Sequence, residues 1–550
     1  MKRYFMILVA LAVAVTLASP ALAAVEFKYG GQFKNRIHSS NNTWDGSDEG
    51  SDNLNFLDQR LRLYFTFQAS ENLKLVWKME VGDTTWGNDW PTAGTSTLGK
   101  GGRVGSDAQN VETKNAYIDF NIPNTPVKII SGIQTLNLLN SWIVDDDFSA
   151  IVAKAKFEPF AVTLGYVAAQ NYDLSHYVDN IDSFFFAFDW VQKPFSASLI
   201  GYYQYGRDTI ASVWPWTRSP LGNIGNSTTS AAFFPYYGSL VPSANDMFRN
   251  GLLSVSDNSL FDLGLNFSYK IDWLSAYVTF VKNLGSFDVN IAKSYPLLPP
   301  STNPTNYTKF RSMDYTGWMV DAGVTYYCAP WTANIGGFYT SGQESPSSKV
   351  VGNIFSGLPV DPYQLYFISI DSFKGNDLDR FVMPLSQTKY SSEIIGGGIL
   401  GDTQDRGNGP FTGDVQRGNF WEGYASPFNI WTITVGGSYQ LLPKTKLSAS
   451  YWYFNTSEDV PVALKKTFGI APNGDIIARY EMDSQIGHEF DVYLDHEIVD
   501  GLQLTLVGAY LVAGDAFCPI NRTLSANPNQ IFRKNADDAY ELGARLQWNF

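Results

Sequence analysis

The chain has 550 residues, with 39 Lys and Arg against 53 Asp and Glu, which gives a formal net charge of −14. Only 17% of the residues are charged, whereas 15% are aromatic and 47 are glycine. An acidic balance of this size disfavours binding to nucleic acid, whose phosphates repel it. No composition break or Pro/Gly/Ser linker divides the chain, so we expect one large domain.

The N-terminal segment predicts export. Lys2 and Arg3 precede an apolar run from Tyr4 to Ala18, and Ala21-Leu22-Ala23 has the small-x-small pattern of a cleavage site. These are the parts of a secretory signal peptide, so residues 1–23 are predicted to be removed. A transmembrane anchor is disfavoured because the run is shorter than the roughly 20 residues that a spanning helix needs.

From residue 25 onward, segments in which apolar and polar residues alternate recur along the whole chain. Val25, Phe27 and Tyr29 share one face of the first such segment, and residues 60–69 and 73–81 repeat the pattern. A period of two is that of a β-strand, whose successive side chains point to opposite faces. We therefore predict that residues 24–550 form a single all-β domain.

Short turns alternate strictly with long polar connections along this domain. The short turns lie at residues 70–72, 123–125, 158–159, 193–194, 272–273, 328–330, 443–445 and 499–501. The long connections span approximately residues 39–54, 84–109, 136–149, 170–180, 206–258, 283–314, 341–427, 456–478 and 513–537. This asymmetry predicts an antiparallel transmembrane β-barrel of about eighteen strands (roughly 16 to 20), with short periplasmic turns and long extracellular loops. The uncertainty in this number comes from Tyr363–Ile370 in the 341–427 connection, which forms either an extra hairpin or part of a folded loop.

A soluble β-sandwich also has long alternating strands, so the location of the apolar faces decides between the two folds. In a sandwich, the apolar faces meet in a dry core. Here the opposite face of many strands carries single Lys, Arg and Asp residues, which are costly to bury without partners. A barrel of this size encloses water instead. We therefore expect Phe184, Phe186 and Phe188 to face lipid, and Ser183 and Asp189 to face the lumen.

The charges expected in the lumen separate by strand. The early strands, together with the last strand beside them, carry a basic arc: Lys34, Arg36, Arg60, Arg62, Lys74, Lys78, Lys128 and Arg545. Later strands carry an acidic arc: Asp189, Asp262, Asp321, Glu489 and Asp491. Exceptions such as Glu80, Asp119 and Glu541 make this separation a bias. A basic arc opposite an acidic arc creates a transverse field, which orients polar solutes in a pore.

The connection at residues 136–149 carries Asp145, Asp146 and Asp147 in succession. If it folds into the lumen, these carboxylates form a constriction loop facing Arg60, Arg62 and Lys78, which would favour cations. The alternative is that the three acids lie on an outer loop, solvated or holding a divalent ion. The sequence favours neither.

The chain ends in a strand-like segment, residues 540–550, whose last residue is Phe550. This end resembles the closing strand of bacterial outer-membrane barrels, which the barrel-insertion machinery reads. Residues 57–157 resemble the trimeric outer-membrane porins of sulfate-reducing and related anaerobic bacteria, in R-L-R-L-Y-F (60–65), E-V-G-D-T-T-W-G (80–87) and N-V-E-T-K-N-A-Y-I-D-F-N-I-P-N-T-P (110–126). The resemblance implies a homotrimer in the outer membrane, in contact with lipid and lipopolysaccharide, that lets small hydrophilic solutes diffuse passively.

Signals for catalysis are weak. The four histidines lie far apart without metal-ligand spacing: His38, His176, His488 and His496. No nucleophile motif accompanies them. We predict no enzyme activity, no metal and no cofactor. Cys328 and Cys518 are expected at opposite ends of the barrel, too far apart for a disulfide.

Together these patterns predict a water-filled pore, and the acidic balance predicts a weak preference for cations. Two other functions stay open. One is a substrate-specific channel for an organic solute or sugar, which the long connections 206–258 and 341–427 suit. The other is a barrel that sheathes an electron-carrying cytochrome, although this chain has no C-x-x-C-H haem motif of its own.

Overall fold

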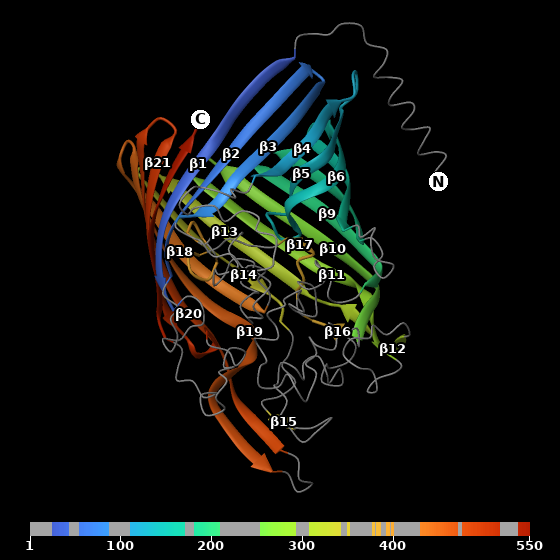
Figure 1. Ribbon diagram of the computed structural model, residues 1–550, viewed down its shortest axis with the longest axis vertical. Coiled ribbons are helices and arrows are strands. Elements are labelled where there is room, and N and C mark those ends of the chain that lie inside the picture. Colours follow the sequence, from blue (N-terminus) through green and yellow to red (C-terminus); the bar gives the residue numbers. More distant parts are fainter. Residues whose placement is uncertain are drawn as a thin grey trace.

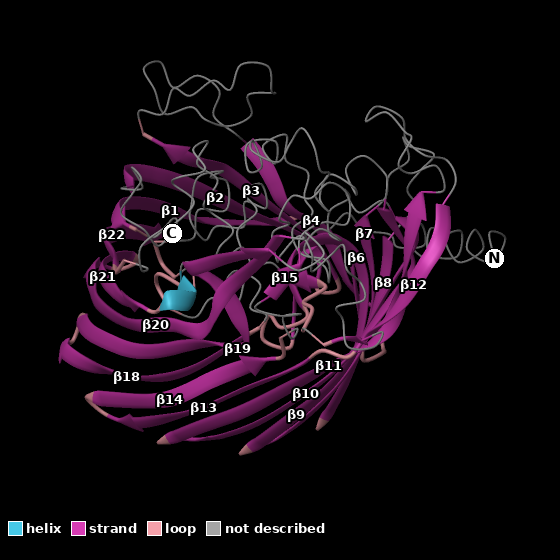
Figure 2. Ribbon diagram, turned by 90° about the horizontal axis from the view of Figure 1, so that it is seen from below, coloured by secondary structure: helices cyan, strands magenta, loops and turns pink. Residues whose placement is uncertain are grey.

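The computed structural model describes residues 25–42, 54–86, 111–170, 181–209, 253–292, 307–342, 349–351, 377–379, 381–386, 392–396, 398–400, 429–470, 476–517 and 537–550. These residues form one closed barrel of antiparallel strands, with described loop segments inside the ring (Figures 1 and 2). The predicted signal peptide and Tyr363–Ile370 lie outside the described residues.

The strands follow one another along the chain and pair mostly with their sequence neighbours. Their bounds are β1 Glu26–Asn41, β2 Leu54–Ser70, β3 Leu73–Thr85, β4 Val111–Asn121, β5 Val127–Leu138, β6 Val144–Phe157, β7 Phe160–Gln170, β8 Ile181–Gln192, β9 Phe195–Thr209, β10 Leu253–Ile271, β11 Leu274–Ala292, β12 Tyr307–Tyr315, β13 Trp318–Cys328, β14 Trp331–Thr340, β15 Lys349–Val351, β16 Asp377–Leu378, β17 Leu385–Ser386, β18 Ile430–Leu442, β19 Thr445–Ile470, β20 Ile476–Val499, β21 Leu502–Ala513 and β22 Ala539–Asn549. A short 3₁₀ helix, η5, spans Asp515–Phe517.

The wall of the barrel has eighteen strands in the described part of the chain. Strands β12 and β13 count as one, because both pair antiparallel with β11, β13 along its first half and β12 along its second half. The short strands β15, β16 and β17 lie within the connection between β14 and β18. Pairing of β1 with β22 closes the ring. The predicted barrel of eighteen strands is therefore confirmed for the described part of the chain.

The short turns fall where the alternation places them, and they gather at one end of the barrel. The C-terminus lies at this end, because Asn549 donates a backbone hydrogen bond to Gly501 in the β20–β21 turn. Several of the predicted long connections are shorter in the structure: β11 continues to Ala292, β19 continues to Ile470, and β5 and β6 extend to Leu138 and from Val144. Periodicity fades near the outer ends of β11 and β19, which is why the sequence placed their ends too early.

The outer face of the wall is apolar, as expected for a barrel whose outside contacts lipid. Phe184, Phe186 and Phe188 are 49%, 38% and 42% exposed, whereas Ser183 and Ala187 between them are buried on the lumen side. Exposed Leu75, Ile151, Leu265, Ile335 and Phe490 continue this surface around the barrel. A soluble protein rarely exposes so much contiguous apolar surface, but the outside of a membrane barrel does. No helix among the described residues has the length and apolar character to cross a membrane.

Candidate functional site

The hairpin of β5 and β6 leaves the wall and enters the lumen. Strand β5 pairs with β4 only as far as Ile133, and β6 pairs with β7 only from Ala150. Beyond these points the two strands remain paired with each other as far as Leu138 and Val144. We call residues 134–149 the inner hairpin. Because it is unpaired with the wall, its two faces point toward opposite parts of the lumen.

A glycine marks the point of departure. Gly132 has a φ of +135°, a conformation that side chains with a Cβ rarely adopt. A Cβ added there would also collide with the carbonyl oxygen of Ala116 and with Tyr117 on β4. The backbone can therefore turn away from β4 only because this position carries no side chain.

One face of the inner hairpin is apolar and belongs to a buried cluster that includes side chains of β7–β9. Leu136, Leu138 and Phe148 are buried in one cluster with Phe185 and Tyr202 of these strands. Burial of apolar side chains inside the barrel fixes this face of the hairpin against the wall.

The tip of the inner hairpin reaches the far side of the lumen. Trp142 is fully buried, and its indole nitrogen donates a hydrogen bond of 2.8 Å to Asp321 on β13. Its ring packs edge-on against Phe338 of β14. The tip also touches β10, where a Cβ added at Gly264 would lie 2.6 Å from a methyl group of Leu139.

The other face of the inner hairpin is polar and acidic. Asp147 accepts hydrogen bonds from Thr135 at 2.5 Å and from Asn115 of β4 at 2.9 Å. Asp145 accepts one from Asn137 at 3.2 Å. The third acid, Asp146, lies on the packed face, because it pairs with buried Leu136. The structure thus places all three acids in strand β6, inside the barrel, and not in a loop as the sequence suggested.

The basic residues nearest this acidic face surround one carboxylate. Glu80, which is only 1% exposed, forms ion pairs with Arg62, with Lys114 at 3.6 Å and with Arg60 at 3.9 Å. Asp147 of the inner hairpin is within electrostatic reach of Lys78. The polar face of the hairpin and the basic residues of β2–β4 therefore form two oppositely charged sides of one space.

Lys114 was not predicted from the sequence. Strict alternation with Asn115 and Asp119 on the lumen side would point Lys114 outward. A β-bulge opposite Lys78 and Met79 shifts the register and turns the Lys114 side chain inward. Nothing in the local sequence marks this bulge.

The rest of the basic arc is paired or buried. Lys74 and Lys128 both contact Asp119, at 3.2 and 2.8 Å. Lys34 and Arg36 are buried, and Arg545 is half-buried. Only part of the basic arc is therefore accessible to water, and its role in lining the pore stays a prediction.

The acidic arc differs more from its predicted role. Asp262, Asp321, Glu489 and Asp491 are all buried, at most 4% exposed. Only Asp189, which accepts a hydrogen bond from Ser198, is half-buried. These acids face the lumen, but inserted segments cover them. The prediction that they line the water path is wrong for the four buried residues. Asp321 instead accepts a hydrogen bond from Trp142 and Glu489 binds the second inserted segment, whereas Asp262 and Asp491 accept hydrogen bonds from Asn283 and Ser450 of the wall.

Two segments of the β14–β18 connection occupy the lumen beside the inner hairpin. The first includes Phe381 and Val382. The backbone N–H of Val382 donates to the side-chain oxygen of Asn283, and its C=O accepts from the side-chain nitrogen of the same residue. This segment continues into β17, which pairs in parallel with the start of β6 at Val144 and Asp145. It therefore adds a third strand to the inner hairpin.

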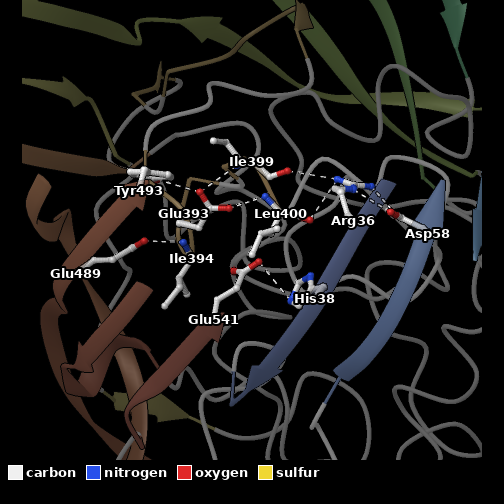
Figure 3. A network of polar contacts seen from close by, with 10 residues as sticks. All are labelled: Arg36, His38, Asp58, Glu393, Ile394, Ile399, Leu400, Glu489, Tyr493 and Glu541. Atoms are coloured by element: carbon white, nitrogen blue, oxygen red, sulfur yellow. Dashed lines mark hydrogen bonds and ion pairs between the residues drawn. The ribbon is translucent and has the colours of Figure 1, made fainter. Parts of the chain in front are cut away.

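The second segment, residues 392–396 and 398–400, is here called the strap (Figure 3). Glu489 of β20 accepts hydrogen bonds from the N–H groups of Ile394 at 2.5 Å and Ile395 at 3.1 Å, and from the hydroxyl of Ser392 at 2.8 Å. One carboxylate on the wall thus binds the start of the strap at three points.

The far end of the strap is held in a similar way. Its own Glu393 accepts hydrogen bonds from the N–H groups of Leu400 at 2.5 Å and Ile399 at 3.0 Å, and from the hydroxyl of Tyr493 on β20 at 2.9 Å (Figure 3). Arg36 of β1 donates to the carbonyl oxygens of Ile399 and Leu400, both at 3.4 Å. Arg36 also forms a bidentate ion pair with Asp58 of β2, at 3.0 and 2.6 Å.

The described residues contain no group of three or more His, Cys, Asp or Glu side chains that could hold a metal ion. His38 pairs with Glu541 at 3.3 Å, His488 bonds to Tyr451 and His496 bonds to Thr445. His176 and Cys518 lie outside the described residues. Cys328 is an exposed free thiol at the β13–β14 turn.

Neither a protein-family model nor a curated protein sequence matches this chain. Among solved structures, the chain is similar to OccK8 (OprE) of Pseudomonas aeruginosa, with 10% identity and a TM-score of 0.42 over 96% of this chain and 98% of that chain. OccAB4 of Acinetobacter baumannii gives 9% identity and a TM-score of 0.43 over the same shares. OccK9 (OpdG) of Pseudomonas aeruginosa gives 8% and 0.44, over 95% of this chain and 98% of that chain. Similarities this low say nothing about which solute passes, so the function is argued from the residues of this chain.

Proposed function

We propose that the protein is a porin of the bacterial outer membrane, through which small hydrophilic solutes and ions diffuse with a weak preference for cations. The observation that carries this proposal is the two-faced inner hairpin. Its apolar face lies in a buried cluster with side chains of β7–β9, and its polar face with Asp145 and Asp147 is turned toward the basic residues of β2–β4. Solutes pass between these two charged sides.

The geometry supports passage of polar solutes and exclusion of apolar ones. A solute between Asp147 on one side and Arg62 and Lys78 on the other lies in a transverse field, because the two sides carry opposite charge. A polar solute exchanges part of its hydration for contacts with these groups, whereas an apolar solute gains nothing in return. Glu80 neutralises part of the basic side, which leaves the overall acidity of the chain to set the preference for cations.

A substrate-specific channel is the second candidate, and one observation favours it. The inner hairpin, the segment at residues 381–386 and the strap all lie inside the barrel, so they narrow the path of a solute. Such narrowing suits a channel that selects among small solutes. It does not suit a sheath for a cytochrome, which needs a wide lumen.

The outer-membrane location, the lipid and lipopolysaccharide contacts and the homotrimer belong to this proposal. The apolar outer wall supports the membrane location, and the sequence resemblance supports the trimer. Cross-linking of the purified protein in detergent tests the trimer. No catalytic role, metal or cofactor is part of the proposal.

Recording the purified protein in planar lipid bilayers tests the function. A general porin gives steady conductance proportional to salt concentration, and a salt gradient gives a reversal potential of the cation-selective sign. A substrate-specific channel gives conductance that particular solutes block in a saturable way. Strong anion selectivity, or no conductance from the assembled protein, contradicts the proposal.

A further inference from the structure

Four carboxylates are crowded where the strap meets the wall. Glu393 of the strap, Glu489 and Asp491 of β20, and Glu541 of β22 all lie in one buried region. No hydrogen-bond donor reaches the Oδ1 atom of Asp491 in the described residues, although this atom is buried. Such an unpartnered oxygen is costly for an ionised carboxylate, because water is excluded from it.

The positive groups around this cluster do not balance its acids. Arg36 of β1 faces the strap but is already paired with Asp58 of β2. Arg545 of β22 acts on Glu393 from the other side, and His38 of β1 pairs with Glu541. Lys34, two positions before Arg36 on the same face of β1, is also buried. Tyr493 is a neutral donor to Glu393. Among the described residues, the five carboxylates of this region (Glu393, Glu489, Asp491, Glu541 and Asp58) outnumber its permanent positive charges (Lys34, Arg36 and Arg545), which favours bound protons while the strap covers the cluster.

We propose that the strap is a proton-controlled closure of the lumen: it stays bound to β1 and β20 while the carboxylate cluster is protonated, and it leaves the lumen as the cluster loses protons. This inference rests on the proposed pore function and assigns that pore a regulation by pH. Acidic medium narrows the path of solutes, and neutral to alkaline medium widens it.

The direction follows from linkage between protons and the position of the strap. Burial raises the pKa of Glu393, although the N–H groups of Leu400 and Ile399 oppose this shift. In a released strap the same carboxyl is in water, with the ordinary pKa of about 4.3. The bound strap therefore holds more protons than the released strap. The contribution of protonated Glu393 to the stability of the bound strap is fully present below the ordinary pKa. It is lost as the pH rises through the raised pKa.

Thiol labelling of the strap tests the proposal without relying on conductance. Ile395 is 2% exposed, so a cysteine there is shielded while the strap is bound. The experiment uses the full chain carrying Ile395→Cys, with Cys328→Ser and Cys518→Ser, and a charged water-soluble methanethiosulfonate reagent. Lys446→Cys in the same background gives the reference rate, because this position faces the lumen, exposed and away from the strap.

The ratio of the Ile395→Cys rate to the Lys446→Cys rate removes the effect of thiol ionisation. We expect this ratio to rise about tenfold between about pH 5 and about pH 8, the size that a shift of one pKa unit gives. Adding Glu393→Gln should reduce the rise to less than about threefold, because it removes a titrating group. Asp189→Asn is the control, since Asp189 also faces the lumen and accepts a hydrogen bond from Ser198 of β9, away from both the strap and Lys446. It should leave the tenfold rise intact.

If Glu393→Gln does not assemble, Asp491→Asn relieves the same crowding from the wall and should flatten the profile in the same way. Conductance measured in parallel should rise with pH in the unmodified protein. A labelling ratio that stays constant with pH overturns the strap proposal, even when conductance is normal. A ratio that rises with pH while no variant conducts supports the strap and overturns the pore.

Discussion

Trp142 and Asp321 join opposite sides of the lumen through a hydrogen bond of 2.8 Å from the indole nitrogen to the carboxylate. Trp142 lies at the tip of the inner hairpin and Asp321 lies on β13, where Tyr277 of β11 donates a second hydrogen bond to it at 2.9 Å. The carboxylate thus accepts one hydrogen bond from the wall and a second from the inner hairpin. This contact fixes the distance between the hairpin and the wall behind it.

Trp142→Phe removes the hairpin's donor but keeps an aromatic ring in its place. We expect a loss of about 1.5–3 kcal/mol in the stability of the inserted hairpin, because a hydrogen bond to a buried charged group is removed. The result should be larger and noisier single-channel currents. Tyr277→Phe is the control, since it takes a donor from the same carboxylate without touching the hairpin. Equal noise in both variants would count against an anchoring role for Trp142.

Asp147→Asn removes one charge from the polar face of the hairpin while keeping its hydrogen bonds to Thr135 and Asn115 possible. We expect the cation-to-anion permeability ratio, obtained from reversal potentials in a salt gradient, to fall by about two- to threefold. Lys78→Gln should raise the ratio by a similar factor. Asp189→Asn, which lies near the short turns, should change it less. An unchanged ratio in Asp147→Asn places this residue outside the solute path.

Gly132→Ala should destabilise the fold at the point where β5 leaves β4. The substitution forces alanine into a φ of +135° and drives its Cβ into Ala116, a cost of about 1–3 kcal/mol. Urea unfolding of the reconstituted protein measures this loss. Gly508→Ala is the control, because an added Cβ there meets only Leu542, at 3.3 Å. If both variants unfold at the same urea concentration, the strain at Gly132 has been overstated.

Arginine at neighbouring positions of β10 distinguishes the two sides of the wall. Leu265 is 50% exposed on the outer face, whereas Asn266 bonds to Thr279 on the lumen side. Leu265→Arg should cost about 2–4 kcal/mol in lipid, and Asn266→Arg should cost much less because water is available to it. Folding yield into lipid vesicles reports the difference. A larger defect for Asn266→Arg would reverse the assignment of the faces.

The wall was predictable because its signal is local. Alternation with a period of two and the short turns define strands and their faces, as at Phe184 to Phe188, without knowledge of distant contacts. The basic residues near the start of the chain and the acids on later strands could be assigned to the lumen for the same reason. The closure of β1 against β22 then follows from an even strand number.

The interior was not predictable, because it depends on which distant segments fill the lumen. Glu489 and Asp321 look like pore-lining acids in the sequence, yet one binds the strap and the other binds Trp142. The position of a residue in the two-residue repeat of a strand predicts that its side chain faces inward. It does not predict whether another segment covers that side chain. Lys114 was missed because a bulge turns its side chain to the lumen face, and nothing in the local sequence indicates this bulge.

Adjacent cysteines at Arg62 and Leu63 test the central claim, which is that water lies inside the wall and lipid outside. In a background with Cys328→Ser and Cys518→Ser, a charged thiol reagent should modify Arg62→Cys and reduce single-channel conductance. It should leave Leu63→Cys unmodified, while a lipid-soluble maleimide should modify that position without changing the current. Rapid reaction of the charged reagent with Leu63→Cys, together with protection of Arg62→Cys, would contradict the account.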